Sequence, residues 1–178
     1  AQSADMIVHG ATDGDDLGFR VTCGTLDGDA LADVVLSALF ADGPSEARPT
    51  AGEVYLLRGR TSTPPSGSPS RRLLIDPYTA AVQTPVDLSV ATSSGDPALT
   101  LHGAGTADQL GFALAVGDLD NDGFSDLLAS ARRYDRSATL VNTGVVYILN
   151  GGATVLMPGP SARTIDLLAG TMRDFYTG

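Results

Sequence analysis

The stretch "GDLDNDGFSDLL", from Gly117 to Leu128, decides the fold because it places crowded negative charge directly before apolar residues. Four aspartates fall within nine positions of it, at Asp118, Asp120, Asp122 and Asp126. Like charges this close repel one another unless a cation lies between them. Short apolar segments bounded by Gly and Asp are typical of β-strands. The stretch therefore predicts a cation-binding turn that leads into a strand.

A looser version of the same words, "GTLDGDALADVV", begins at Gly24, 93 positions earlier. Leu-Gly-Phe and His-Gly-Ala recur with the same spacing, and "GEVYLLRG" at Gly52 returns as "GVVYILNG" at Gly144, 92 positions later. Four motifs that recur in the same order indicate an internal repeat. The chain is therefore built from two related units.

Each unit consists of short segments rich in Val, Leu, Ile and Tyr, and no segment has helical periodicity over a useful length. In the second unit we expect strands at Leu99–Leu101, Phe112–Val116, Asp126–Ser130 and Val145–Leu149. Four-stranded units in tandem are typical of propeller blades. The sequence predicts an all-β fold with two four-stranded β-propeller-type blades plus the first strand of a third, in an incomplete propeller.

The predicted organisation has four parts. They are a first blade at residues 1–59, a Ser/Pro/Gly/Arg-rich insertion at 60–98, a second blade with the acidic loop at 99–151, and a linker with an opening strand of a third unit at 152–178. The third unit is suggested by "TIDLLAGT", Thr164 to Thr171, which resembles "LTLHGAGT" at Leu99.

Composition excludes several classes of protein. The 178 residues carry a net charge of −10 with no basic cluster, so nucleic acid is not an expected partner. No apolar run approaches the roughly 18 residues of a membrane span. The single cysteine, Cys23, lies in an apolar alternation and is expected to be a buried small hydrophobe.

The second acidic loop fits calcium, which takes six to eight oxygen ligands at about 2.3–2.6 Å. The expected ligands are the carboxylates of Asp118, Asp120, Asp122 and Asp126 and the backbone carbonyl of Phe124. An EF-hand is excluded, because its twelfth position requires Glu and here that position is Ala129. The alternative is an Asp-rich turn without metal; we expect Ca²⁺, since Mg²⁺ rarely has such an all-protein cage.

The first acidic loop has an incomplete ligand set. Its equivalent positions are Thr25, Asp27, Asp29, Leu31 (through its carbonyl) and Asp33. A hydroxyl replaces the first carboxylate, and Ala30 replaces the glycine of the turn. Lower ligand charge weakens calcium binding, so occupancy of this loop stays open.

The words "LGFALAVGDLDNDGFSDLLASA" and "GVVYILNG" resemble the FG-GAP repeat, which builds the β-propeller of integrin α subunits and of many bacterial secreted proteins. Two departures are the order Gly-Phe and the replacement of Gly-Ala-Pro by Ser37-Ala38-Leu39 and Ser130-Ala131-Arg132. The resemblance implies calcium in the loops and a secreted or cell-surface location. Propellers of this family usually have seven blades, which implies that two units are an incomplete propeller.

An enzyme is not expected, because His9 and His102 occupy the same repeat position and no catalytic motif is present. We expect a calcium-binding extracellular structural module that self-assembles into a ring or filament. Its partners would be copies of itself or other blades of the same protein, with the strand at Thr164–Leu168 pairing with another subunit. One alternative is an adhesion fragment of a longer integrin-like propeller that binds a surface protein or glycan. Another is an accessory part of a secreted hydrolase.

Overall fold

The computed structural model describes residues 7–29, 31–61, 72–73, 86–88, 98–152 and 163–169. These residues form strands and two single 3-10 turns (Pro44–Glu46 and Leu167–Ala169), which confirms the predicted all-β class. The strands are β1 (Val8–His9), β2 (Leu17–Gly24), β3 (Asp33–Ala38), β4 (Glu53–Leu57), β5 (Arg60–Thr61), β6 (Arg72–Leu73), β7 (Val86–Asp87), β8 (Leu99–His102), β9 (Leu110–Gly117), β10 (Asp126–Ala131), β11 (Val145–Leu149) and β12 (Arg163–Asp166).

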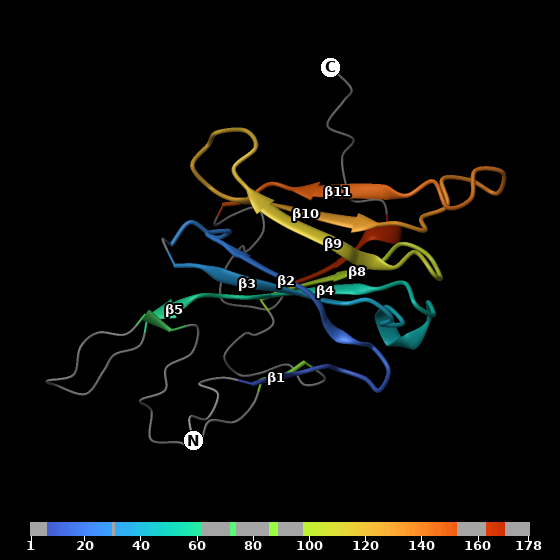
Figure 1. Cartoon of the computed structure of the whole chain (residues 1–178), viewed down its shortest axis with the longest axis horizontal. Coiled ribbons are helices and arrows are strands. Elements are labelled where there is room, and N and C mark those ends of the chain that lie inside the picture. The colour runs from blue at the N-terminus through green and yellow to red at the C-terminus, as the bar shows by residue number, and fades with distance from the viewer. Residues whose placement is uncertain are drawn as a thin grey trace, which may run out of the picture.

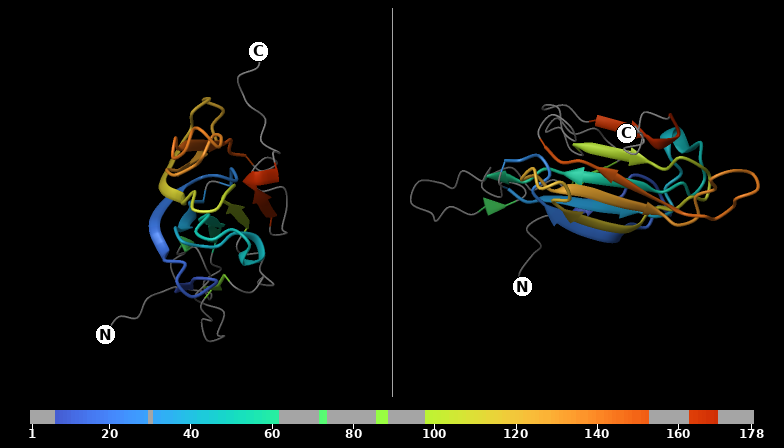
Figure 2. Two further views of the ribbon diagram at one scale, coloured as in Figure 1. Left: turned by 90° about the vertical axis from the view of Figure 1, so that its right-hand side faces the viewer. Right: turned by 90° about the horizontal axis from the view of Figure 1, so that it is seen from above.

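Two sheets form the body of the molecule. The first sheet has the order β12-β8-β4-β3-β2, and the second has the order β11-β10-β9. Figure 1 shows the second sheet stacked above the first, with β1 below both, and the view from above in Figure 2 shows the stacked strands running along a common direction. Two short ribbons, β1-β7 and β5-β6, account for the remaining named strands.

The strand expected to open the second unit lies in the first sheet instead. β8 pairs antiparallel with β4, with Leu101 opposite Val54. The strands β2, β3, β4 and β8 therefore form one four-stranded blade whose outer strand comes from the next unit, and the second sheet has three described strands. The physical reason is burial, because Leu99 and Leu101 are completely buried in the core between the sheets. The repeat pattern by itself does not fix which sheet receives this strand.

The strand near the C-terminus also differs from expectation. β12 pairs in parallel with β8 of its own chain, with Asp166 opposite His102, a neighbour that the sequence did not predict. Arg48 fixes the position, since its two terminal nitrogens donate to the carboxylate of Asp166 at 2.8 and 2.7 Å. This ion pair lowers the pKa of Asp166.

The pairing of β12 has a counterpart at the N-terminus. β7, from within the predicted insertion, pairs in parallel with β1, and Asp87 lies opposite His9. "VDL" at 86–88 corresponds to "IDL" at 165–167, and Leu88 and Leu167 are both buried. Each unit thus has an outer strand with a parallel neighbour.

The main core lies between the two sheets. Its buried residues are Leu26, Val35, Val54, Leu56, Ala98, Leu99, Leu101, Ala104, Leu110, Leu127, Ala129, Ala131, Leu149 and Leu167. Burying each leucine contributes roughly 1.5–3 kcal/mol. The sheets approach closely at Gly111, which has a φ of +84° and whose Cβ, if present, would lie 2.4 Å from the Cβ of Ser37. A residue without a side chain is therefore required there.

A second core lies below the first sheet. Leu36, Ala38, Ala41, Tyr55, Leu57 and Leu88 are buried there, with Val8 of β1 packed against them. Cys23 is on the same face but on the outlying strand β2, where it is exposed. The expectation of a buried cysteine is therefore wrong, because the second core reaches Leu17 of β2 and leaves the Cys23 end of the strand uncovered.

Candidate metal site

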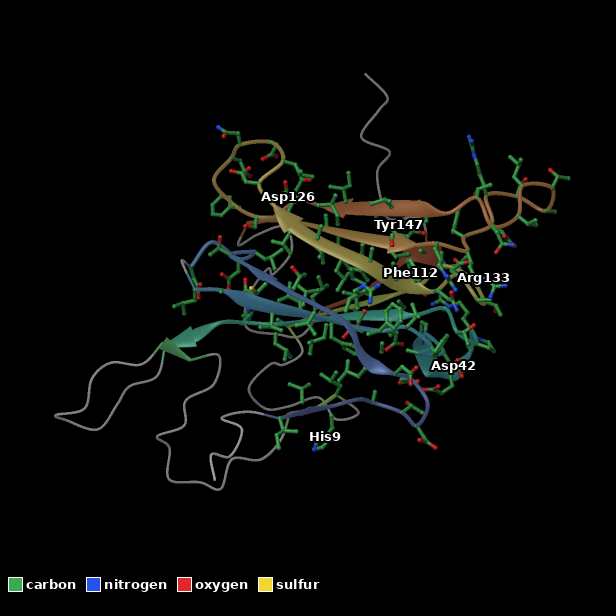
Figure 3. All side chains as sticks on the ribbon, in the orientation of Figure 1. His9, Asp42, Phe112, Asp126, Arg133 and Tyr147 are labelled. Atoms are coloured by element: carbon green, nitrogen blue, oxygen red, sulfur yellow. The ribbon has the colours of Figure 1, made fainter. Side chains whose placement is uncertain are left out.

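The two acidic loops lie side by side at one end of the stacked sheets. Residues 25–32 join β2 to β3, and residues 118–125 join β9 to β10. The N–H of Ser125 donates to the carbonyl of Thr25 at 3.1 Å, and the N–H of Gly152 donates to the carbonyl of Leu26 at 2.8 Å. The repeat therefore brings both loops together, and Asp126 lies where the upper loop enters β10 (Figure 3).

Three of the predicted ligands converge in the second loop. Asp118, Asp120 and Asp126 each place a carboxylate oxygen within 4.8 Å of those of the other two. Across the described part of the chain, no other set of three acidic, His or Cys side chains meets this criterion. Asp118 and Asp120 are exposed and Asp126 is buried, so the group opens to solvent on one side. An all-oxygen donor set of this kind suits a hard cation such as Ca²⁺.

Hydrogen bonds from carboxylate to backbone shape the loop. The carboxylate of Asp118 accepts the N–H of Gly123 at 3.0 Å, and that of Asp120 accepts the N–H of Asp122 at 3.1 Å. Asp122 in turn accepts the N–H of Phe124 at 2.9 Å. Such short-range bonds between Asp side chains and backbone N–H groups fix the conformation of the turn.

One predicted carboxylate, that of Asp122, is not part of the group of three. The carboxylate of Asp122 is occupied with its own turn. The ring of Phe124 lies against the first loop, because a Cβ at Gly28 would be 2.3 Å from its edge. Phe124 therefore joins the two loops through its side chain, a contact that the sequence does not predict.

Asp126 fastens the loop to the sheet. Its side chain is 1% exposed, and its two oxygens accept the N–H groups of Leu119 and Gly151, both at 2.8 Å. The first bond closes the loop, and the second ties it to Gly151, two residues beyond the end of β11. This anchoring role was missed in the sequence, although the recurrence of Asp before a strand and Gly after the next one in both units was a visible signal.

The first loop repeats this skeleton without gathering its carboxylates. Asp27 accepts the N–H of Asp29 at 3.0 Å, and Asp29 accepts the N–H of Leu31 at 2.8 Å. The hydroxyl of Thr25 lies 3.5 Å from that of Ser125. Asp33 is completely buried, and burial raises its pKa to about 6.

The guanidinium of Arg58 lies beside the first loop. The Nε of Arg58 is 3.9 Å from a carboxylate oxygen of Asp27. In the second unit the equivalent residue is Asn150, whose amide donates to Asp120 at 3.4 Å. This exchange was not predicted, although it is visible as "LLRG" in the first unit against "ILNG" in the second. Arg58 supplies positive charge where the second loop has a neutral amide.

The stacked sheets and the paired loops define a β-propeller-type repeat module. Residues 110–149, which span β9 to β11, match the sequence model of the FG-GAP repeat, so this part of the chain is similar to an FG-GAP repeat. No curated protein sequence matches the chain. FG-GAP repeats often bind calcium and are typical of extracellular or cell-surface proteins. Within the described residues, no helix is long and apolar enough to cross a membrane.

Proposed function

We propose that the chain is a calcium-binding structural module of a secreted or cell-surface protein. A single Ca²⁺ would be held in the loop between β9 and β10 and would stiffen the second sheet. The observation that carries the proposal is the convergence of Asp118, Asp120 and Asp126. Two unit charges about 4 Å apart repel by about 1 kcal/mol even in water, so three mutual contacts favour a bound cation.

These three residues would supply carboxylate oxygens to the ion. The carbonyl of Phe124 and the carboxylate of Asp122 are the further predicted donors, and water completes a coordination shell of six to eight oxygens. The ion would bridge the exposed turn to the buried Asp126, which already accepts a hydrogen bond from Gly151, beyond the end of β11. Calcium would therefore connect the loop to the sheet rather than act on a substrate.

The histidines support a scaffold role. The Nδ1 of His102 is 2.6 Å from a carboxylate oxygen of Glu53, which also accepts a hydrogen bond from the hydroxyl of Tyr55. Glu53 and Tyr55 lie on β4 and His102 on β8, so the contact joins two strands of one blade. This use of His102 supports the proposed scaffold role.

Thermal unfolding with and without calcium tests the metal site. A ligand at one hundred times its Kd stabilises the native state by about 2.7 kcal/mol, so calcium should raise Tm. Asp120→Asn should remove most of the rise, and Asp27→Asn at the equivalent position of the first loop should keep it. Equal Tm values for the wild-type protein in calcium and in chelator would contradict the proposal.

The three-stranded second sheet favours a module that another module completes. Other blades of one longer protein would give an integrin-like propeller with an adhesive role toward a surface protein or glycan. Copies of this chain would give a homo-oligomer, as a ring or filament. Both belong to the proposed structural function, and the surfaces at the two ends of the stack favour the second.

A further inference from the structure

The contact between the two sheets shows how one unit covers the next. The upper face of the first sheet presents Val35, Ser37, Val54 and Leu56, all at most 1% exposed. The lower face of the second sheet covers them with Leu127 and Ala129, joined by Leu114 and Val116. Because the units are repeats, this internal contact is a template for any further contact of the same kind.

The upper face of the second sheet presents the equivalent residues, but no further sheet in the described part of the chain covers them. Leu128, Ser130, Val146 and Ile148 are the repeat equivalents of Val35, Ser37, Val54 and Leu56. Val146 is 56% exposed and Ile148 is 44% exposed. Ala113 and Ala115 extend this exposed face along β9. An apolar sheet face this open marks an interaction surface.

The lower face of the first sheet is open at the matching place. Val21 is 62% exposed and Cys23 is exposed. Their equivalents on the second sheet, Leu114 and Val116, are partly buried against the first sheet. The chain thus carries both halves of the template contact, one at each end of the stack.

Glycines show the same complementarity. A Cβ at Gly111 would lie 2.4 Å from Ser37, and a Cβ at Gly24 would lie 2.3 Å from Val116. Their equivalents, Gly18 and Gly117, have nothing within 4 Å of that position. The glycines between the two sheets therefore have close neighbours, whereas the equivalent glycines on the two outer faces have none.

The strand edges are complementary as well. β8 pairs with β4 on one side and with β12 on the other. β1, the equivalent of β8, pairs only with β7 among the described residues, and β11, the equivalent of β4, pairs only with β10. Figure 3 shows His9 on the lowest strand and Tyr147 on the uppermost one, so these free edges lie at opposite ends of the stack.

We infer that a second copy of this chain docks head-to-tail, with its β1 paired antiparallel to β11 as β8 is paired to β4. Transferring the template register places Val8 opposite Val146 and His9 opposite Val145. The upper face of one copy's second sheet then covers Val21 and Cys23 of the next copy. The contact is heterologous, so repetition gives a ring or a filament.

This inference names the partner in the proposed function and rests on its structural part rather than on its metal. A second copy is favoured over an unrelated partner because the chain itself supplies each missing element: the outer strand, the apolar cover and the two glycine clearances. β-strand addition at an exposed edge is an established mode of recognition. No feature of the contact requires Ca²⁺.

Sedimentation of the full chain over a range of concentrations provides the first test. The wild-type protein should associate progressively, and its Cys23 thiol should become protected from a labelling reagent. Gly117→Val should abolish association while preserving the fold, because the free chain has space for the side chain and valine suits a strand. Val146→Asp should also abolish it, whereas Val141→Asp, at a site 57% exposed in the β10–β11 connection, should not.

Disulfide trapping provides the second test. In a Cys23→Ser background, chains with Val8→Cys and chains with Val146→Cys should give a cross-linked dimer only when mixed. Mixing Val8→Cys with Thr139→Cys should give none, because Thr139 is exposed outside the proposed contact. Cα atoms of facing antiparallel residues lie about 4.5–5.5 Å apart, within disulfide range.

Three results would overturn the inference: a wild-type monomer at every concentration, association unchanged by Gly117→Val, or cross-linking of Val146→Cys chains with themselves alone. The first would leave other blades of a longer protein as the cover of this face. Repeating the sedimentation in chelator separates the two proposals. Association without a calcium-dependent rise in Tm would refute only the metal site, and the rise without association would refute only the docking.

Discussion

Asp33 and Asp126 make the same pair of hydrogen bonds in the two repeat units. Each side chain is at most 1% exposed. Each accepts one N–H from the start of its loop and one from the glycine two residues beyond β4 or β11. The four N···O distances are all 2.8 Å. In both units this carboxylate determines where the acidic loop sits on its sheet.

Replacing either carboxylate by its amide should destabilise the fold. In Asp33→Asn and Asp126→Asn, an amide N–H would face a backbone N–H, leaving a buried donor unsatisfied at a cost of about 1–3 kcal/mol. Denaturant unfolding in chelator would measure it, with the exposed Asp13→Asn as control. If the two variants unfold at the same denaturant concentration as the control, the anchoring role is wrong.

Asp33 should also make stability depend on pH. Burial raises its pKa to about 6 in the folded chain, so the native state binds a proton more tightly than the unfolded state, whose Asp has a pKa of about 3.9. The free energy of unfolding should therefore fall as pH rises from about 4 to 6 and level off above. Asp33→Asn should have a shallower slope over this range. Parallel curves for the two proteins, measured in chelator, would refute the shift.

The repeat in the sequence was sufficient for the class of fold and for the position of the second acidic loop. It did not predict which sheet the strand Leu99–His102 joins. The strand lies between the two units in the sequence, and its apolar pattern would be the same in either sheet. Burial of Leu99 and Leu101 between the sheets decides the matter, and burial is a property of the assembled layers.

The candidate site divides in a similar way. Spacing brought Asp118, Asp120 and Asp126 together, because alternate residues of a tight turn point toward one centre. Spacing gave no information on Arg58, which approaches Asp27 only after β4 is placed beside β3. The exposure of Cys23 was likewise unpredictable, since alternation specifies a face and the neighbouring layer specifies whether that face is covered.

Replacing Arg58 by Asn should increase calcium binding in the first loop, and replacing Asn150 by Arg should decrease it in the second. Arg58→Asn removes the cation beside Asp27, and the first loop should then bind a second ion weakly, because Thr25 still replaces one carboxylate. Asn150→Arg places a guanidinium near Asp120 and should weaken binding in the second loop by like-charge repulsion. Calorimetric titration gives the stoichiometry of each variant. An unchanged stoichiometry and affinity in both variants would show that Arg58 has no role in loop selectivity.

The bidentate ion pair between Arg48 and Asp166 should hold β12 on the sheet. Asp166→Asn weakens a charge-assisted pair beside a guanidinium that is 11% exposed, and a loss of about 1.4 kcal/mol would speed local opening about ten-fold. Hydrogen exchange should therefore accelerate in the amides of β12 and stay unchanged in β10, and the exposed Leu168→Ala should not reproduce it.

Arg48 lowers the pKa of Asp166, so the pair stabilises the chain above the ordinary pKa of aspartate, about 3.9, and loses that effect as pH falls through the lowered value. The difference between the wild-type and Asp166→Asn proteins should accordingly vanish in strong acid, and a difference that persists there would assign the effect to packing rather than charge.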